Sequence, residues 1–451
     1  MNLNTSVTHN AVALSQQLAW TARMLHAVEQ GRSLSDALPK VPDALRPGVQ
    51  ALTFHALRHW GQADVLVKLL VQRTPPPLVR ALLGVALTLL CTPATPGVQP
   101  DYASHTVVDQ AVSALAALKV PRAQSGFVNG CLRRFLREQA ELEAQAAQDA
   151  VARWNHPFWW VQRVRRDHPQ HWQQVLLTNN QAAPMTLRVN RRRVTRDAYL
   201  AQLQAQGHVA TPVGDDGVVL ARAVPVERLP DWAQGHASVQ DAAAQLAAPL
   251  LLQGAALPTR AHVLDACAAP GGKTAHLLEY ADLDVLALDV DPVRCQRIHD
   301  NLQRLGLQAQ VRAADAAVPA QWWDGRAFDA ILLDAPCTAS GIVRRHPDVR
   351  WLRRPDDIAQ LAAQQARLLE ALWPLLKPGG RLLYCTCSVF KAEGDQQIAA
   401  FAAQHGAQVR VLPAPGHVLP GWQWPQGGIN DNAAGGFDGF FYALLEKAAV
   451  V

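Results

Sequence analysis

The second half of the chain alternates apolar runs with amphipathic segments, and this alternation restricts the fold more than any other feature. Runs typical of strands occur at 262–266, 284–289, 308–312, 328–334 and 381–387. Segments with helical spacing of apolar residues lie at 274–280, 292–305 and 356–376. Strands that alternate with helices in this way predict a doubly wound, largely parallel α/β sheet.

Two cysteine-bearing signatures stand at the ends of the last two apolar runs. Residues 331–338 read Ile-Leu-Leu-Asp-Ala-Pro-Cys-Thr, and residues 382–388 read Leu-Leu-Tyr-Cys-Thr-Cys-Ser. Open α/β sheets place their chemistry in the crevice at the carboxyl ends of the strands. We therefore expect Cys337 and Cys387 in one crevice, where two thiols beside a ligand loop favour covalent attack on a substrate.

A loop of small residues follows the first apolar run. Residues 262–274 read His-Val-Leu-Asp-Ala-Cys-Ala-Ala-Pro-Gly-Gly-Lys-Thr, and the two glycines allow the backbone to approach a ligand beside a helix start. The next strand ends in Asp289, an acid placed to accept hydrogen bonds from ribose hydroxyls. The loop is neither a dinucleotide fingerprint nor a phosphate loop. A nucleoside cofactor without a pyrophosphate fits better, and we predict S-adenosyl-L-methionine.

The sequence Asp334-Ala-Pro-Cys337 narrows the chemistry further. It has no aromatic residue to stack on a base, as methylation of an exocyclic amine would require. A thiol suits methylation of carbon 5 of cytosine: a thiolate adds to carbon 6, carbon 5 becomes nucleophilic and takes the methyl group, and the thiol leaves after the hydrogen on carbon 5 is removed. Asp334 is placed to hydrogen-bond a protonated ring nitrogen. The residues alone do not decide which of Cys337 and Cys387 attacks.

Several motifs in this order resemble the RNA 5-methylcytosine methyltransferases of the Nop2/Sun (Fmu) family. The resemblance rests on Asp265 to Thr274, Asp334 to Cys337, Thr386 to Ser388, Ile342 to Leu352 and Phe437 to Tyr442. It runs from Trp154 to Lys447 and continues more weakly into the first third, where Gly126 to Phe135 looks like a NusB-type helical RNA-binding domain.

This resemblance implies the roles of the site residues. Cys387 would be the nucleophile, Cys337 would assist product release, and Asp334 would activate the base. Asp315 would face the adenine of the cofactor, although as a lone acid it equally suits a helix cap. The full set implied for cofactor binding is Cys267, Ala268, Ala269, Pro270, Gly271, Gly272, Lys273, Asp289, Asp315 and Asp334.

The implied substrate is one cytosine of the 16S ribosomal RNA of the small subunit. Two alternatives stay open: the same reaction on transfer RNA, and a non-catalytic RNA-binding factor. The basic clusters predicted to contact RNA comprise Arg188, Arg191, Arg192, Arg193, Arg344, Arg345 and His346. Trp351 suits stacking on a base or packing in a core.

The length of 451 residues predicts more than one domain. Helical periodicity over 8–140, with loops at 75–77 and 92–100, favours a NusB-like helical RNA-binding domain at 1–150. Short strands and one helix at 197–206 favour a small α+β module at 151–260. The alternating segments make residues 261–451 a Rossmann-like methyltransferase domain.

Composition and sequence pattern restrict the compartment and the partners that we expect for this protein. The formal charge of +5 permits nucleic-acid binding, and seven cysteines without framework spacing suit a reducing cytosol. No apolar run reaches the length of a membrane span and no leader pattern is visible, so we expect a cytoplasmic protein, and a monomer. Cys385 is expected to point away from Cys387, and no histidine stands at zinc spacing, so no metal is predicted.

Overall fold

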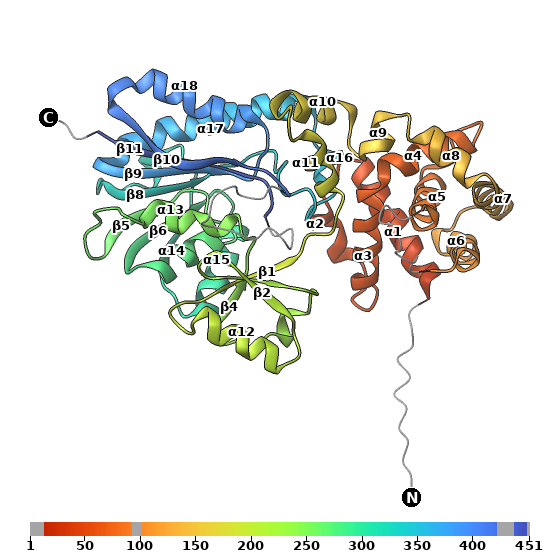
Figure 1. Cartoon of the computed structure of the whole chain (residues 1–451), viewed down its shortest axis with the longest axis horizontal. Coiled ribbons are helices and arrows are strands. Elements are labelled where there is room, and N and C mark those ends of the chain that lie inside the picture. Colours follow the sequence, from red (N-terminus) through yellow and green to blue (C-terminus); the bar gives the residue numbers. More distant parts are fainter. Residues whose placement is uncertain (1–12, 93–101, 422–436, 449–451) are drawn as a thin grey trace, which may run out of the picture. The chain divides into compact units, whose positions relative to one another are not determined.

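The computed structural model describes residues 13–92, 102–421 and 437–448 (Figure 1). The chain divides into two compact units, and each is described here by itself. The first comprises residues 1–163 with 346–353, and the second comprises residues 164–345 with 354–451. The loop expected at 92–100 lies outside the described residues except for Thr92, as does the start of the helical region. The bounds predicted for the three domains, 1–150, 151–260 and 261–451, stay a prediction.

The first unit is helical, as its periodicity predicts. Its helices are α1 Leu14–Glu29, α2 Leu34–Ala37, α3 Arg46–Arg58, α4 Trp60–Leu70, α5 Pro77–Leu90, α6 Ser104–Leu118, α7 Ala123–Arg137, α8 Gln139–Ala146 and α9 Ala150–Trp154. Helix α5 has a proline in its first turn and buries residues on every side, so it forms the centre of the core.

A short segment from far along the chain completes this helical core. Helix α16 (Val349–Leu352) packs with the first unit, where the indole nitrogen of Trp351 donates a hydrogen bond of 2.9 Å to the carbonyl oxygen of Leu57. Asp348 accepts a bond of 2.9 Å from the backbone N–H of Leu34. Of the two roles open for Trp351, the structure supports packing.

The second unit begins with α10 (Phe158–Asp167, which crosses the boundary), α11 (Trp172–Asn179) and a small antiparallel sheet. Its strands are β1 Met185–Val189, β2 Ala210–Val213, β3 Gly217–Leu220 and β4 Ala237–Val239, in the order β2-β3-β1-β4. Helix α12 (Arg196–Ala205) buries Tyr199 and Leu203 against Leu187 and Val189 of β1. This is the α+β module that the sequence predicts.

The large sheet of the second unit has seven strands in the order β10-β11-β9-β8-β5-β6-β7. They are β5 Ala261–Asp265, β6 Leu283–Asp289, β7 Gln310–Ala313, β8 Phe328–Asp334, β9 Leu376–Thr386, β10 Val409–Val418 and β11 Phe440–Lys447. Figure 1 shows α17 (Pro355–Leu372) and α18 (Asp395–His405) along one side, and α13 (Ala247–Leu252), α14 (Gly272–Tyr280) and α15 (Pro292–Leu305) along the other.

Local sequence fixes the ends of these helices. Asp291 caps α15 by accepting a bond from the N–H of Val293, Pro292 stands in the first turn, and Gly306 ends the helix in the left-handed region.

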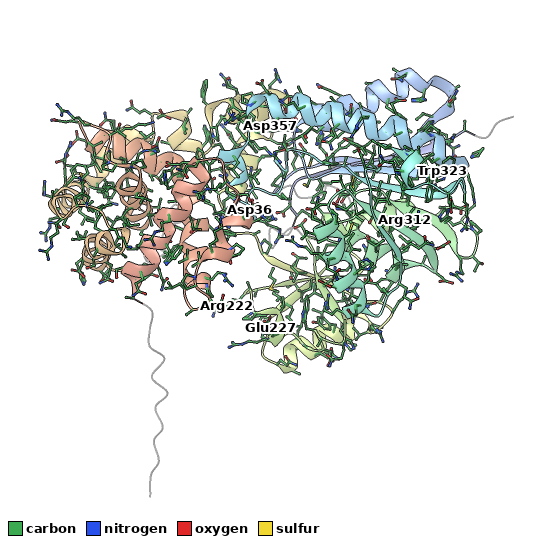
Figure 2. The ribbon with its side chains drawn as sticks, turned by 180° about the vertical axis from the view of Figure 1, so that it is seen from behind. Asp36, Arg222, Glu227, Arg312, Trp323 and Asp357 are labelled. Carbon is green, nitrogen blue, oxygen red and sulfur yellow. The ribbon has the colours of Figure 1, made fainter. Side chains whose placement is uncertain are left out.

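At the edge of the sheet, Arg312 on β7 (labelled in Figure 2) donates a bond of 2.9 Å to the carbonyl oxygen of Trp322.

The sheet is largely parallel, as predicted, and two added strands make it mixed. Strands β9, β8, β5, β6 and β7 are parallel, but β11 pairs antiparallel with β9, and β10 with β11. The sequence predicts neither β10 nor β11. The parallel part still brings the carboxyl ends of β9, β8, β5 and β6 side by side, in that order. No helix of the described part is both long and apolar enough to cross a bilayer.

Candidate active site

The predicted cofactor loop follows β5 and leads into α14. Gly271 adopts φ +93°, a conformation that favours glycine, and a Cβ atom there would make a tight contact of 3.1 Å with the side chain of Ile298. The carboxylate of Asp289, at the end of β6, accepts a bond of 3.2 Å from the backbone N–H of Ala269. Neighbouring strand ends thus hold the loop in shape.

A buried carboxylate lies at the start of this loop. Asp265 is fully buried, and Thr274 donates a bond of 2.6 Å to its Oδ2. Its Oδ1 accepts no hydrogen bond from any described residue. Burial raises the pKa of Asp265 to about 7, with the charges of Asp334 and Asp289 in the same direction and the Thr274 bond opposed. An unsatisfied buried acceptor suits a cationic group such as the ammonium of an amino acid.

An ion pair joins this loop to the next strand. Lys273 Nζ lies 2.6 Å from Asp334 Oδ2, and the two side chains are 11% and 29% exposed. Burial alone would lower the pKa of Lys273, but the negative charge of Asp334 raises it overall. A fixed ammonium and a partly open carboxylate therefore stand together at the carboxyl end of β8.

The two predicted thiols meet beside this ion pair. Cys337 Sγ and Cys387 Sγ lie 3.4 Å apart, although the residues are 50 positions apart in sequence. Backbone bonds of 2.9 Å fix their loops: the Ala335 N–H donates to the carbonyl of Cys385, and the Gly341 N–H donates to the carbonyl of Cys387. Neither thiol side chain is fully buried. The expectation that strand ends deliver both cysteines to one crevice agrees with this geometry.

The surroundings of Cys337 keep its proton in place. The hydrogen bond with Cys387, burial, and the negative charge of Glu393 together raise the pKa of Cys337. Cys337 is therefore a thiol that resists ionisation.

Sequence models of known families match three stretches of the chain. The model described as 16S rRNA methyltransferase RsmB/F matches residues 255–446, a ferredoxin-like domain of the RsmF/B-like methyltransferases matches 156–227, and the NusB family matches 12–137. Ribosomal RNA small subunit methyltransferase B of Salmonella typhi is 42% identical over 431 residues, which are 93% of this chain and 96% of that protein. The chain belongs to the 16S rRNA methyltransferase RsmB/F family.

Solved structures agree with this membership. A methyltransferase homologue from Pyrococcus horikoshii is 27% identical, covering 66% of this chain and 97% of its own, with a TM-score of 0.54. A second solved structure, 24% identical, covers 95% of this chain and 99% of its own with a TM-score of 0.73 and shows the shared fold. The NusB-like helical domain, the ferredoxin-like module and the Rossmann-like domain are confirmed, and S-adenosyl-L-methionine is the cofactor of this methyltransferase family.

The predicted cofactor residues fit such a group. Gly271 is buried, Pro270 is exposed, and Cys267, Ala269 and Gly272 are partly open. Burial raises the pKa of the Cys267 thiol, so Cys267 suits a packing role. Residues 267–273 form one stretch after β5, and Lys273 at its end pairs with Asp334 at the end of β8.

The two predicted acids of the cofactor site also make bonds within the protein. Asp289 is 3% exposed and accepts a bond from the N–H of Asp291 as well as from Ala269. Asp315 is 32% exposed, accepts a bond from the N–H of Ala317 and pairs with Arg367 at 3.0 Å. Asp315 thus bonds within a turn and caps no described helix, and contact with an adenine stays a prediction.

The expectation for Cys385 is wrong. Its thiol lies 3.5 Å from Asp334 Oδ1, and it shares a core with Cys387 instead of facing away from it. Residues two apart in a strand point to the same face, so the physical rule contradicts the expected alternation. Burial raises the pKa of Cys385, which keeps it an uncharged packing residue. No group of three or more metal-ligating side chains gathers anywhere in the described part of the chain.

Two of the predicted RNA contacts are wrong. Arg188 has no exposed surface: it lies on β1 and donates two bonds of 2.8 Å to the buried carboxylate of Glu279. Arg344 is 1% exposed and pairs with the buried Asp438. Guanidinium groups that are enclosed and neutralised in this way cannot reach a phosphate.

The other basic residues differ in how far they are available. Arg345 is 23% exposed, and its guanidinium pairs with Asp241 at 2.7 Å and with Asp438 at 2.5 Å. Its charge is therefore neutralised by acids within the protein. The exposed Arg191 and Arg192 pair with Asp216 and the carbonyl of Ala281. Arg193 and His346 are exposed. RNA contact by Arg191, Arg192, Arg193 and His346 stays a prediction.

Sequence reasoning missed one residue at the centre of the site. Glu393 lies six positions after Cys387, is completely buried and bonds to both cysteine loops. No motif points to it, because an isolated glutamate in a polar stretch is usually a surface residue. Asp265 stands within the resembled stretch, but the sequence does not distinguish it from any other strand-end acid.

Proposed function

We propose that this protein methylates carbon 5 of one cytosine in 16S ribosomal RNA, through a covalent adduct between Cys387 and carbon 6 of the base. The observation that carries this proposal is the pair of thiols 3.4 Å apart beside the Lys273–Asp334 ion pair. The curated relatives named small subunit methyltransferase B support ribosomal RNA as the substrate.

The cofactor would be held by the loop 267–273 with Asp265, Asp289 and Asp315. The unsatisfied buried oxygen of Asp265 supports this, because it suits the ammonium of the methionine moiety. S-adenosyl-L-methionine supplies an electrophilic methyl group when bound.

The cysteines and the ion pair would do the remaining chemistry. The Cys387 thiolate forms a bond to carbon 6, and the electron pair of the carbon 5–carbon 6 double bond then makes carbon 5 nucleophilic. Asp334 accepts a hydrogen bond from the protonated ring nitrogen, and Lys273 holds that carboxylate in place. Once carbon 5 carries the methyl group, a base takes its proton. The electron pair of that bond re-forms the carbon 5–carbon 6 double bond and expels the Cys387 thiolate, a release that Cys337 assists from 3.4 Å away.

Charge supports Cys387 over Cys337 as the nucleophile. Lys273 interacts electrostatically with Cys387, whereas Cys337 faces Glu393. A cation stabilises a thiolate, and an anion opposes its formation.

The test is a methyl-transfer assay with purified full-length protein. Unmethylated small-subunit ribosomal RNA and transfer RNA are each incubated with labelled S-adenosyl-L-methionine, digested to nucleosides and analysed by mass spectrometry. We expect 5-methylcytidine from the ribosomal RNA, none from transfer RNA, and none with Cys387→Ala. A methyl group on another atom would refute the reaction, and cofactor binding without transfer to either RNA would favour the non-catalytic factor.

A further inference from the structure

Glu393 is the most completely bonded carboxylate near the two thiols. It lies in the turn Lys391–Glu393 and has no exposed surface. Its Oε1 accepts the backbone N–H of Thr338 at 2.8 Å and the side-chain amide of Gln365 at 3.2 Å. Its Oε2 accepts the hydroxyls of Thr338 at 2.5 Å and Ser388 at 2.6 Å.

These four donors favour the ionised form of Glu393. A carboxylate accepts at both oxygens, whereas a protonated acid would have to donate to one of these groups. Burial raises the pKa of Glu393, but the bonds from Ser388, Thr338 and Gln365 oppose that rise. A buried negative charge therefore stands next to the site, and hydrogen bonds from Thr338, Gln365 and Ser388 stabilise it.

The donors also follow the two cysteines directly in sequence. Thr338 comes after Cys337 in the loop that leaves β8, and Ser388 comes after Cys387 in the loop that leaves β9. One carboxylate thus connects two loops that are 50 residues apart and whose sulfur atoms touch. Loss of Glu393 would free both loops and leave buried donors without acceptors, which is costly.

The charges around the sulfur pair are unequal. The charge of Glu393 raises the pKa of Cys337, as do the contact with Cys387 and burial. Lys273, whose own partner is Asp334, acts on Cys387 and on Cys385. Tyr384 interacts electrostatically with Cys337, and Tyr442 with Cys387. Burial raises the pKa of both tyrosines, so they stay neutral.

We propose that Glu393 is a positioning residue, which fastens the two cysteine loops together and keeps Cys337 as the protonated donor of an S–H···S hydrogen bond to Cys387. The inference rests on the proposed function, in which Cys387 acts as thiolate. It assigns Cys337 a task before release: its S–H bond stabilises the attacking sulfur. The proton stays on Cys337, and no covalent bond changes.

The test compares the reactivity of the two thiols in wild type and Glu393→Gln. Full-length protein, kept reduced, is alkylated with iodoacetamide between pH 6 and pH 10, and Cys337 and Cys387 are followed separately by peptide mass spectrometry. In wild type we expect Cys387 to react at lower pH than Cys337. In Glu393→Gln the profile of Cys337 should move to lower pH by about one unit, because the nearby anion is gone. An unchanged profile, or Cys337 reacting first in wild type, would overturn the inference.

Control variants separate this role from simple loss of structure. Glu370→Gln makes the same change at a carboxyl group on α17 that is 39% exposed and should leave both profiles unchanged. Thr338→Val removes one donor to Glu393, whereas Thr338→Ser keeps the hydroxyl, so only the first should lower the rate of methyl transfer. For Glu393→Gln we expect a fall of about 100-fold, as misplaced reacting groups produce. Equal rates for the two Thr338 variants would contradict the positioning role.

Alkylation needs neither RNA nor cofactor, so it remains informative if methyl transfer fails. A shifted Cys337 profile without 5-methylcytidine formation would refute the proposed function and not the role of Glu393. Normal methylation with an unshifted Cys337 profile would refute the role of Glu393 and not the proposed function.

Discussion

The buried carboxylate Asp265 gives a prediction whose size follows from the structure. Its pKa of about 7 in the folded protein compares with an ordinary value of 3.8. Because the folded-state value is raised, the stabilising contribution is complete below about pH 4 and is lost as the pH rises to about 7. A difference of about three pH units corresponds to roughly 4 kcal/mol of unfolding free energy, an upper bound because local relaxation reduces it.

Asp265→Asn removes this dependence on pH. The amide oxygen still accepts the Thr274 hydroxyl, but no charge has to be buried. We expect the substituted protein to be more stable than wild type at pH 8, and the difference to grow by roughly 3 kcal/mol between pH 5 and pH 8. Cofactor affinity should fall about 10- to 100-fold, because one charge-assisted hydrogen bond is lost.

Two measurements check this prediction. Urea denaturation of wild type and Asp265→Asn at pH 5 and pH 8 gives the difference in stability, and isothermal titration gives the affinity for S-adenosyl-L-methionine. A difference that does not depend on pH would show that Asp265 is ionised in the fold. Unchanged affinity would show that its free oxygen does not face the cofactor.

Three further substitutions test where individual residues lie in the structure. Arg188→Ala leaves Glu279 charged and buried, so we expect the unfolding free energy to fall by roughly 3–5 kcal/mol. Arg193→Ala, at an exposed position, should keep the melting temperature and weaken RNA binding in a salt-dependent titration. If Arg188→Ala kept its stability and weakened RNA binding instead, Arg188 would belong to the RNA-binding surface. Gly341→Ala would place a Cβ atom 2.0 Å from the carbonyl oxygen of Gly439, so the loop after Cys337 should shift. We expect the rate of methyl transfer to fall about 100-fold. Normal activity would show that the loop tolerates displacement.

The sequence predicts the parts of the site that depend on strand ends. Cys337, Cys387 and Asp289 each follow an apolar run, and parallel strands bring such positions to one edge. Periodicity also predicts the helical unit and the small α+β module. The sequence did not predict strands β10 and β11, which pair antiparallel at one end of the sheet.

Long-range partners explain what the sequence did not predict. Arg188 and Glu279 are 91 residues apart, and Arg344 and Asp438 are 94 apart. Before folding, each arginine looks like one member of a basic surface cluster, and only the tertiary structure supplies the buried acid. Glu393 is hidden for the same reason, since its donors come from three separate segments.

The central claim is that Cys387 forms a covalent bond to the RNA, from which Cys337 helps to release it. Cys337→Ala is incubated with unmethylated small-subunit ribosomal RNA and S-adenosyl-L-methionine, separated on a denaturing gel, and the cross-linked peptide is sequenced by mass spectrometry. We predict a protein–RNA adduct that accumulates and maps to Cys387. An adduct mapped to another residue, or full turnover by Cys387→Ala, would contradict the mechanism.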